Sequence, residues 1–406
     1  MAEILILGAG MAGIGAALAL QERGHTVRLV DRRAPGEETS FGNAGVIQAE
    51  AMEPYAMPRD IATLWRYALG LSNDVAWSLR DLPRFAPALL AYFRASAPAR
   101  HARISKVYSR LIGQAVADHS PLIEAAGADN LIRRTGLGEV FRDRRTFDAA
   151  RTAAEATAAR YGLALRVLDA SRLRAEDPAF TADLAGALVW EDSWSCLDPG
   201  GLVQAYARLF ERRGGIFAKG DAATLTWANP GWRVTTEDGA AEAEHAVIAL
   251  GPWSAELVGR FGYKATMLLK RGYHTHLDMQ VPLSRPYHDA ANGIVLSSMR
   301  EGLRLTTGAE LVRPDRPGSD RQLKRGLQVA AELVGAHAKP DARVWRGHRP
   351  CMPDMLPVVG PVPGQVGLWL HFGHGHQGFT LGPTTGRILA AQLDGAEPDL
   401  GLKWTD

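Results

Sequence analysis

The first thirty-one residues hold the pattern that most constrains how this chain can fold. A short apolar run at residues 4–7 is followed by Gly8, Gly10 and Gly13, and then by small apolar residues at helical spacing. A second apolar run, residues 26–30, ends at Asp31. This order predicts a βαβ unit: a strand, a glycine-rich turn, a helix, a second strand and an acidic residue. Such a unit binds the pyrophosphate of a dinucleotide at the N-terminus of its helix.

Each glycine of this turn has its own expected role. Gly8 makes the tight turn, Gly10 lets the backbone approach a pyrophosphate, and Gly13 lets the helix lie close to the strand. Asp31 can accept hydrogen bonds from both hydroxyls of a ribose, and its charge disfavours the 2′-phosphate of NADP. Arg32 and Arg33, which follow directly, weaken the argument against NADP. The alternative is a glycine-rich helix start that binds nothing, but the flanking strands and the acid favour a dinucleotide.

Composition sets the broad class of the protein. The chain has 406 residues, 46% hydrophobic and 22% charged, which is typical of a globular protein with two domains. The formal net charge of +2 gives no sign of a nucleic-acid partner. With only two cysteines, Cys196 and Cys351, we expect no disulfide framework, no metal site and a cytoplasmic location. The N-terminus lacks the basic start of a signal peptide, and no uncharged run approaches the roughly 20 residues that span a bilayer.

Residues 60–125 are predicted to be helical and combine apolar with basic side chains. An uncharged stretch, residues 85–93, is bounded by Arg84 and Arg94, and five further basic side chains follow up to Arg110. One interpretation is contact with a membrane surface. The other is a helical hairpin that packs on its own domain and turns a solvated basic side outward.

After this region the chain returns twice to the first unit. Asp198 can cap a helix with Pro199 at its first position, and the apolar run 245–250 ends in Gly251. Strands are expected at 216–218, 224–227, 232–236, 293–298, 303–307 and 367–372, and a final helix at 383–393. We therefore expect an α/β chain, α+β overall. A Rossmann-like domain would comprise residues 1–60, 196–255 and 345–406, and a discontinuous second domain, 61–195 and 256–344, would be built on an antiparallel sheet plus helices.

These blocks together resemble the D-amino-acid-oxidase (DAO) family of flavoproteins, which includes glycine and sarcosine oxidases. The resemblance spans essentially the whole chain. Its further blocks are residues 196–199, 247–254, 347–350, 353–360 and 373–378. Within the family the chain is most similar to bacterial D-amino acid dehydrogenases of the small-subunit type. That closer similarity is carried by Ser40-Phe41-Gly42-Asn43-Ala44-Gly45, by Arg271-Gly272-Tyr273 and by the helical insert before residue 125.

The resemblance implies FAD as the cofactor, bound in an extended form. The pyrophosphate and the adenosine would lie on Gly8, Gly10, Gly13, Asp31, Arg32, Ser40 and Ala222. Gly251 and Trp253 would flank the pyrophosphate and the ribitol. One side of the isoalloxazine would be lined by Asn43, Ala44, Gly45 and Val46. N–H groups would be aimed at its N1/C2=O end by Gly375, Gln377, Gly378, Phe379 and Thr380. Cys351 does not align with the cysteine that tethers flavin in sarcosine oxidases, so the resemblance implies non-covalent FAD.

The resemblance also implies where the substrate binds. The family's carboxylate-binding arginine corresponds to Arg349, whose guanidinium fork suits a carboxylate. Structural pairing with an acid such as Asp354 is the alternative for this arginine. Tyr273 is either a wall of the substrate pocket or a core aromatic residue. His376 is either a catalytic base or a loop residue that packs and hydrogen-bonds near the flavin.

The implied function is FAD-dependent oxidation of a D-amino acid or a cyclic imino acid. The Cα hydride of the substrate would pass to flavin N5, and the imine would hydrolyse to a keto acid and ammonia. Electrons would then pass to a quinone or a dye. The alternatives are an amine oxidase of the glycine or sarcosine oxidase type that makes H2O2, and a D-hydroxyproline dehydrogenase or opine oxidase subunit in a hetero-oligomer. The expected location is the cytoplasm, with contact to the inner face of the cytoplasmic membrane left open.

Overall fold

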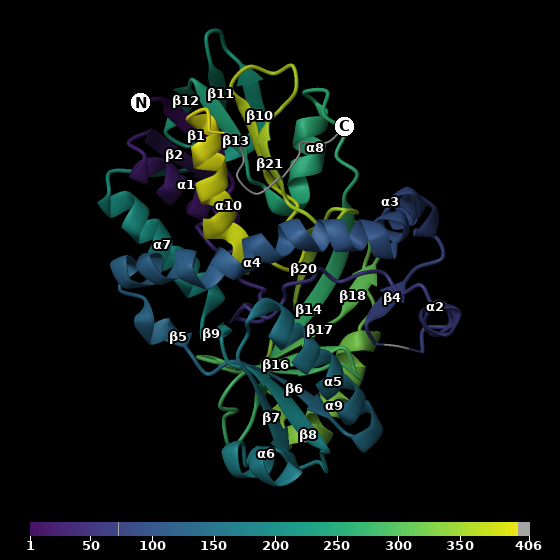
Figure 1. Cartoon of the computed structure of the whole chain (residues 1–406). Helices are drawn as coiled ribbons and strands as arrows, with labels where there is room; N and C mark the ends of the chain where they lie inside the picture. The colour runs from purple at the N-terminus through teal and green to yellow at the C-terminus, as the bar shows by residue number, and fades with distance from the viewer. Residues whose placement is uncertain (72, 397–406) are drawn as a thin grey trace.

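Two large β-sheets divide the molecule into an upper and a lower half (Figure 1). The computed structural model describes residues 1–71 and 73–396. The upper half holds an eight-stranded sheet and the lower half an eleven-stranded sheet, and helix α4 (Pro98–Ala126) crosses between them. The N-terminus lies on the upper half. This mixed α/β architecture confirms the fold class expected from the sequence.

The first sheet begins with the predicted βαβ unit. Its order is β12-β11-β10-β2-β1-β13-β22-β21, and β10, β2, β1, β13 and β22 run parallel. The strands are β1 (Glu3–Leu7), β2 (Thr26–Asp31), β10 (Ile216–Trp227), β11 (Trp232–Thr236), β12 (Gly239–Ala243), β13 (His245–Ile248), β21 (Val358–Pro361) and β22 (Leu368–Phe372). The central strands β1, β13 and β22 are almost entirely buried, as expected where helices cover a parallel sheet.

Three helices lie beside this sheet. They are α1 (Met11–Glu22), α7 (Pro199–Arg212) and α10 (Gly378–Leu393), and α1 contacts both of the others. A Cβ on Gly386 would lie 2.6 Å from the backbone nitrogen of Ala16, and one on Gly382 would lie 2.6 Å from the carbonyl oxygen of Met11. These glycines let the α1 and α10 backbones touch, which brings the N-terminus of α10 next to the glycine turn.

The second sheet has the order β4-β18-β14-β17-β16-β15-β6-β8-β7, and β19 and β20 also pair with β14. Its strands are β4 (Val75–Trp77), β6 (Leu137–Phe141), β7 (Leu165–Asp169), β8 (Gly186–Trp190), β14 (Leu268–Asp278), β15 (Tyr287–Asp289), β16 (Ile294–Met299), β17 (Gly302–Thr307), β18 (Ala309–Leu311), β19 (His337–Ala338) and β20 (Trp345–Cys351). A small third sheet joins β3 (Val46–Ile47), β9 (Trp194–Cys196) and β5 (Ile132–Arg133).

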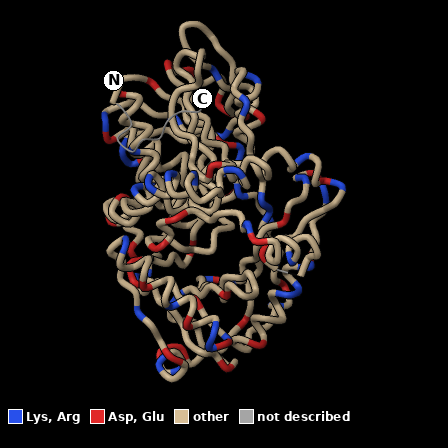
Figure 2. The backbone as a smooth tube through the Cα atoms, turned by 45° about the vertical axis from the view of Figure 1, so that its right-hand side comes forward, with Lys and Arg blue, Asp and Glu red and all other residues tan. Residues whose placement is uncertain are grey.

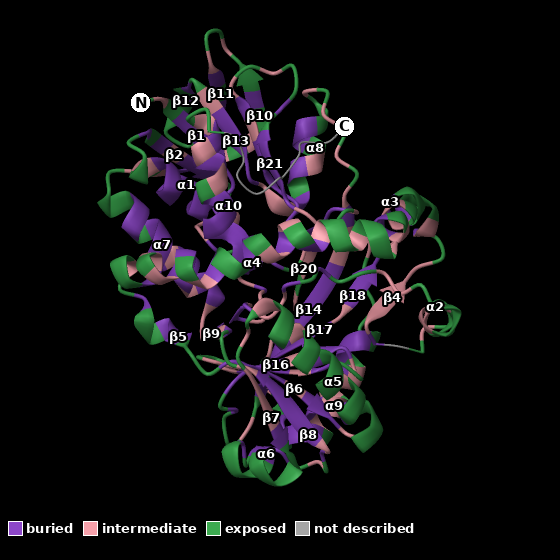
Figure 3. Ribbon diagram, in the orientation of Figure 1, coloured by how far each residue is buried: buried purple, intermediate pink, exposed green. Residues whose placement is uncertain are grey.

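The remaining helices lie mainly on the surface. They are α2 (Ile61–Ala68), α3 (Leu82–Ala95), α5 (Arg144–Tyr161), α6 (Ala170–Glu176), α8 (Ser254–Gly259) and α9 (Arg321–Val334). Figure 3 shows the exposed faces of α2 and α3 at the edge of the molecule, whereas the strands between the helices are buried. Among the described residues, none of the helices has the length and apolar character needed to cross a bilayer.

Several local predictions need correction. Residues 216–227 form one strand with an irregular register between Asp221 and Thr226, not two strands. The final helix begins at Gly378, so Pro383 lies inside it. The region 60–125 also contains β4, which pairs with β18. Residues 345–351 pair with β14 of the second sheet, although the sequence placed them in the first domain. Otherwise the two-domain division stays a prediction.

Candidate active site

A cavity of about 450 Å³ is lined by residues of both large sheets. It contacts the carboxyl ends of β1 and β2, where parallel α/β sheets bind their ligands. Twelve predicted cofactor residues line it: Gly8, Gly10, Asp31, Arg32, Ser40, Asn43, Ala222, Gly251, Trp253, Gly375, Gly378 and Phe379. The three predicted catalytic residues, Tyr273, Arg349 and His376, also line it. The structure therefore gathers fifteen of the predicted site residues around one space.

Six predicted residues lie outside this lining: Gly13, Ala44, Gly45, Val46, Gln377 and Thr380. Gly13 packs against the turn, since a Cβ there would lie 1.8 Å from the Gly8 carbonyl oxygen. Gly45 has φ +72° and packs against the carbonyl of Cys196. Gln377 donates a hydrogen bond to Gln48, and Thr380 accepts one from the Gln48 backbone. These contacts lie behind the cavity wall and give it support.

The glycine turn is held in one shape by close contacts. Gly8 has φ +112°, and a Cβ on it would lie 2.5 Å from the carbonyl oxygen of Ala249. The Ser40 hydroxyl accepts a hydrogen bond from the Met11 N–H at 3.0 Å, in the first turn of α1. Asp31 accepts one from the Ala9 N–H at 2.7 Å. Burial raises the pKa of Asp31, whereas its backbone hydrogen bonds lower it.

Arg32 has partners that the sequence did not reveal. Its guanidinium lies over the Trp253 ring, 4.4 Å from the ring centroid, and its Nε donates to Glu38 at 2.9 Å. Glu38 and Thr39 line the same end of the cavity. The sequence held one signal for Glu38 as a cavity residue. It lies in a loop only seven residues after Asp31.

Arg349 stands on the opposite wall, on β20, in register with Lys270 of β14. Its Nη1 donates to the Gly308 carbonyl at 2.9 Å and its Nη2 to the Thr307 carbonyl at 3.0 Å. A Cβ on Gly272 would lie 2.8 Å from three guanidinium atoms, so the guanidinium rests on the backbone of that glycine. Burial lowers the pKa of Arg349.

Within the described part of the chain, no carboxylate forms an ion pair with Arg349. Asp354, the acid considered from the sequence, instead accepts a hydrogen bond from the Leu356 N–H at 3.3 Å, and burial raises its pKa. The two carbonyls use one donor on each terminal nitrogen and leave other N–H groups of the guanidinium available. A carboxylate in the cavity could use those donors.

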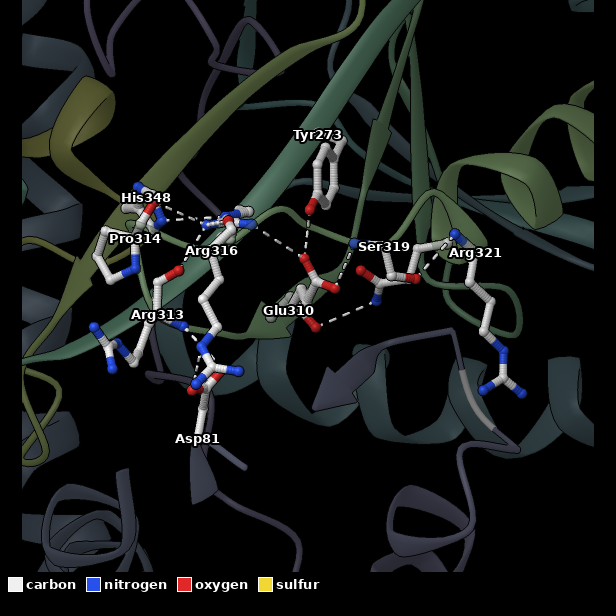
Figure 4. Close-up of polar contacts among 12 residues, drawn as sticks. Asp81, Tyr273, Glu310, Arg313, Pro314, Arg316, Ser319, Arg321 and His348 are labelled. Carbon is white, nitrogen blue, oxygen red and sulfur yellow. Dashed lines mark hydrogen bonds and ion pairs between the residues drawn. The ribbon is translucent and has the colours of Figure 1, made fainter. Parts of the chain in front are cut away.

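The Tyr273 hydroxyl already has a hydrogen-bond partner within the protein. It donates to the carboxylate of Glu310, which also accepts from the Ser319 N–H at 2.9 Å (Figure 4). Arg271, fully buried, lies 3.8 Å from Glu310, and its Nε donates to His348 Nε2 at 3.2 Å. Desolvation and the Glu310 carboxylate raise the pKa of Tyr273 to about 12. The part of Tyr273 left to line the cavity is its ring.

His376 is exposed to the cavity, and its ring makes an edge contact with Tyr55 at 5.9 Å between centroids. Surrounding protein desolvates the ring, and Arg349 and Lys270 add positive charge; together they lower the pKa of His376 well below its usual range. The lowered pKa favours the neutral form of His376. It can make a hydrogen bond as a neutral ring, but it is a weak base.

Trp345 is a cavity residue that no sequence motif indicated. Its ring stacks on His274 with centroids 5.0 Å apart and an interplanar angle of 12°. A Cβ on Gly42 would lie 1.8 Å from this ring, and one on Gly347 would lie 2.1 Å from it. Gly42 and Gly347, neither of which was singled out for its lack of a side chain, are thus needed to make room for one indole.

Residues 3–392 match the family model described as DAO, FAD dependent oxidoreductase. The chain belongs to the DAO family. It is therefore an FAD-dependent oxidoreductase.

Relatives of this flavoprotein cover almost its whole length. D-amino-acid oxidase of Bradyrhizobium diazoefficiens is 29% identical, covering 98% of this chain and 97% of that protein. D-amino acid dehydrogenase of Cereibacter sphaeroides is 29% identical, covering 98% and 93%. The crystal structure of glycine oxidase from Geobacillus kaustophilus has a TM-score of 0.71 at 22% identity, covering 98% and 96%, which shows a shared fold.

The cavity fits FAD on the chain's own geometry. Backbone at Gly8, Gly10 and Gly251 lines it without side chains, at the end where a pyrophosphate would meet the N-terminus of α1. A Cβ on Gly251 would meet nothing within 4 Å, so open space lies over that backbone. The first turn of α10 reaches the same cavity through Gly378 and Phe379. The N-terminal ends of two helices therefore face the space where a large anionic cofactor would lie.

Proposed function

We propose that this flavoprotein is a dehydrogenase that oxidises the Cα–N bond of a D-amino acid or a cyclic imino acid. The observation that carries the proposal is Arg349, a cation on the cavity wall with free donors and no carboxylate partner among the described residues. Relatives named D-amino-acid oxidase and D-amino acid dehydrogenase support the same substrate class. The substrate roles of Arg349, Tyr273 and His376 form part of this proposal.

Arg349 would bind the substrate carboxylate and so fix the position of Cα. A guanidinium held by two carbonyls and a glycine backbone has little freedom, which favours one substrate orientation. His376, neutral beside it, would accept or donate a hydrogen bond without adding charge near the amine. The Tyr273 and Trp345 rings would limit water around the reacting carbon. FAD, when bound, supplies the hydride acceptor, and the imine product hydrolyses in water.

We propose further that FAD is held non-covalently and that the electrons pass to a quinone. Support for a lipid-soluble acceptor comes from the surface of α2 and α3. Ile61, Trp65 and Leu69 recur every four residues, so they share one face, and all three are exposed. None of the eight described residues of α2 is buried. Leu71, Leu79 and Leu90 are also exposed. We call the exposed apolar face formed by Ile61, Trp65 and Leu69 the α2 surface.

Charge around the α2 surface favours an anionic membrane as its occupant. Residues 55–110 contain nine Lys and Arg against three Asp and Glu, a net formal charge of +6 in a chain whose total is +2. In Figure 2, several Lys and Arg positions, drawn in blue, lie on the part of the backbone that extends furthest to the right. Apolar side chains flanked by Arg66, Arg80 and Arg84 match a bilayer surface that carries acidic lipids. Tyr55, six residues before Ile61 in the sequence, is also exposed, and its ring contacts His376 of the cavity.

Vesicle binding tests the α2 surface. The full chain is expected to sediment with vesicles that contain phosphatidylglycerol, less with pure phosphatidylcholine, and less at high salt. Replacing Trp65 and Leu69 together by Ser should weaken binding about tenfold, because apolar burial drives insertion. Val366→Ser, at a residue 81% exposed outside residues 55–110, is the matched control. Equal loss in the control, or no binding by the native chain, would refute the membrane contact.

Turnover assays test the substrate class and the acceptor. With a quinone analogue or dye as acceptor, D-amino acids or cyclic imino acids should be oxidised to keto acids or cyclic imines, and their L-enantiomers should not. Oxygen consumption with the same substrates should be much slower. Fast production of H2O2 would favour the oxidase alternative. Turnover that appears only after a second polypeptide is added would favour the hetero-oligomer alternative.

A further inference from the structure

A small side chamber opens from the cavity beside His376. Its volume is about 40 Å³, and it shares His374, Gly375 and His376 with the main cavity. The other residues that line it are Pro54, Tyr55, Tyr92, Tyr108, Leu268, Lys270, Cys351, Met352, Met355 and Gly373. Three tyrosines and two methionines make its walls mostly apolar, with one charged side chain, Lys270. One water molecule needs roughly 10–15 Å³ of such cavity volume, so the chamber has room for one small group.

Lys270 and Arg349 present two positive charges to the same region. They are directly paired residues of the antiparallel strands β14 and β20, so their side chains leave the same face of the sheet. The Lys270 Nζ lies 4.6 Å from the centroid of the Tyr92 ring. Both cations act on His376, which contacts the cavity and the chamber alike. The chamber therefore adjoins, through His376, the cavity whose wall carries Arg349.

Lys270 has no carboxylate partner within residues 1–71 and 73–396. Its contact with Tyr92 is a cation–π interaction, which leaves the ammonium hydrogens free to bind an anion. Lys270 is partly buried, and an anion that entered the chamber could form a charge-assisted hydrogen bond with its ammonium group. The chain itself supplies no such anion in the described structure.

We propose that the side chamber receives a second anionic group of the substrate and that Lys270 is its counter-charge. The substrate class would be amino or imino acids with two carboxylates, such as acidic D-amino acids. This inference rests on the proposed function, because it assigns the first carboxylate to Arg349. It adds a residue, Lys270, that determines specificity for the group at the far end of the substrate.

The alternative is that the chamber receives a basic side chain of the substrate, next to acidic residues near Tyr55. The substrate comparison below distinguishes the two. Burial raises the pKa of Tyr55, and the negative charges of Glu50 and Glu139 raise it further, so both acids act on this chamber residue although neither lines the chamber. Ser193 and Gln48 already donate to Glu50, and burial raises the pKa of Glu139 to about 7. A raised pKa favours the neutral form of a carboxyl group, which attracts a cation less strongly than a carboxylate does. Lys270 therefore favours an anionic group over a basic side chain.

Matched substrates separate charge from size. In the native protein kcat/KM should be higher for D-glutamate than for D-glutamine, which has the same shape without the charge. Lys270→Met should lower kcat/KM for D-glutamate about tenfold or more, the loss expected for one charge-assisted hydrogen bond. D-glutamine should change less than about twofold. Lys264→Met, at an exposed lysine outside both cavities, should leave both substrates unchanged.

Three outcomes would overturn the inference. They are equal use of D-glutamate and D-glutamine by the native protein, an equal loss for both substrates in Lys270→Met, and a preference for D-arginine. A second readout does not depend on turnover. Glutarate, a dicarboxylate without an amine, should perturb the flavin absorption spectrum at lower concentration than valerate, and Lys270→Met should abolish the difference. If neither D-amino acid reduces the flavin but glutarate still shows this Lys270-dependent effect, the proposed oxidation fails while the chamber stands.

Discussion

At the scale of single residues, the site depends on how backbone and side chain fit at Arg349. Its guanidinium has two carbonyl partners and lies on Gly272, where a side chain would meet three of its atoms at 2.8 Å. These contacts explain why arginine, glycine and tyrosine stand at positions 271–273. Arg271 is buried in the Glu310 network, Gly272 leaves room for Arg349, and the Tyr273 ring lines the cavity.

Gly272→Ala should impair substrate binding without unfolding the protein. The new methyl group would meet the flexible end of Arg349, not backbone, so Arg349 should move and the fold should stay. We expect KM for carboxylate substrates to rise about tenfold, as when one charge-assisted contact is misplaced, with FAD content unchanged. Steady-state kinetics and flavin absorbance check this. Gly259→Ala, where a Cβ meets nothing within 4 Å, is the control. An unchanged KM would show that Arg349 does not depend on Gly272.

At the scale of elements, α10 shows what the sequence could and could not predict. The sequence placed the helix start at Pro383, because proline is favoured in the first turn. The helix instead starts at Gly378, and Pro383 leaves the Phe379 carbonyl without its usual N–H donor. His119 of α4 fills that place, since its Nε2 lies 3.0 Å from the Phe379 carbonyl and 3.1 Å from that of Thr380. Residues 260 positions apart in sequence make this contact, and local patterns do not reveal it.

Other elements followed from local rules. Asp198 caps α7 by accepting from the Gly201 N–H at 2.8 Å, with Pro199 next to it, and α5 ends at Gly162 in the left-handed conformation. Such features depend on a few neighbouring residues. Trp345, Glu38 and Lys270 depend on the pairing and packing of distant segments, so they entered the site only with the structure.

A double-mutant cycle tests the link between Pro383 and His119. In the native chain His119→Gln should cost about 2 kcal/mol of unfolding free energy, because it leaves a buried carbonyl without a well-placed donor. In a Pro383→Ala background the new N–H can pair with the Phe379 carbonyl, so the same substitution should cost less. Denaturant unfolding of the four proteins measures both values. Identical costs in the two backgrounds would show that His119 does not compensate for the proline.

His119 should also make stability sensitive to acid. Burial lowers its pKa to about 4, whereas the unfolded chain would titrate near 6.5. Between these values the unfolded state binds a proton that the folded state does not, so stability falls as pH falls from about 6.5 to about 4. The stability advantage of the native chain over His119→Gln should therefore fall by up to about 3 kcal/mol on acidification, enough to cancel the advantage of about 2 kcal/mol and reverse its sign. Unfolding measured at several pH values checks this, and a difference independent of pH would contradict it.

At the scale of the whole molecule, two sheets meet around one cavity. The first sheet brings the glycine turn and Asp31, and the second brings Tyr273, Trp345 and Arg349. Arg304 of β17 joins the two sides, since its Nη1 donates to the carbonyls of Phe41 and Asn43. The α2 surface lies outside this arrangement, on a segment whose basic residues outnumber its acids.

The central claim is that the cavity holds FAD and an amino acid carboxylate bound to Arg349. Anaerobic mixing of the yellow protein with D- and L-amino acids, prolines and sarcosine tests it most directly. We predict rapid loss of the flavin absorption band with D-amino acids or cyclic imino acids, and a loss of most of that rate in Arg349→Ala with its FAD retained. A yellow protein that none of these compounds bleaches, or equal bleaching rates in Arg349→Ala, would contradict the account.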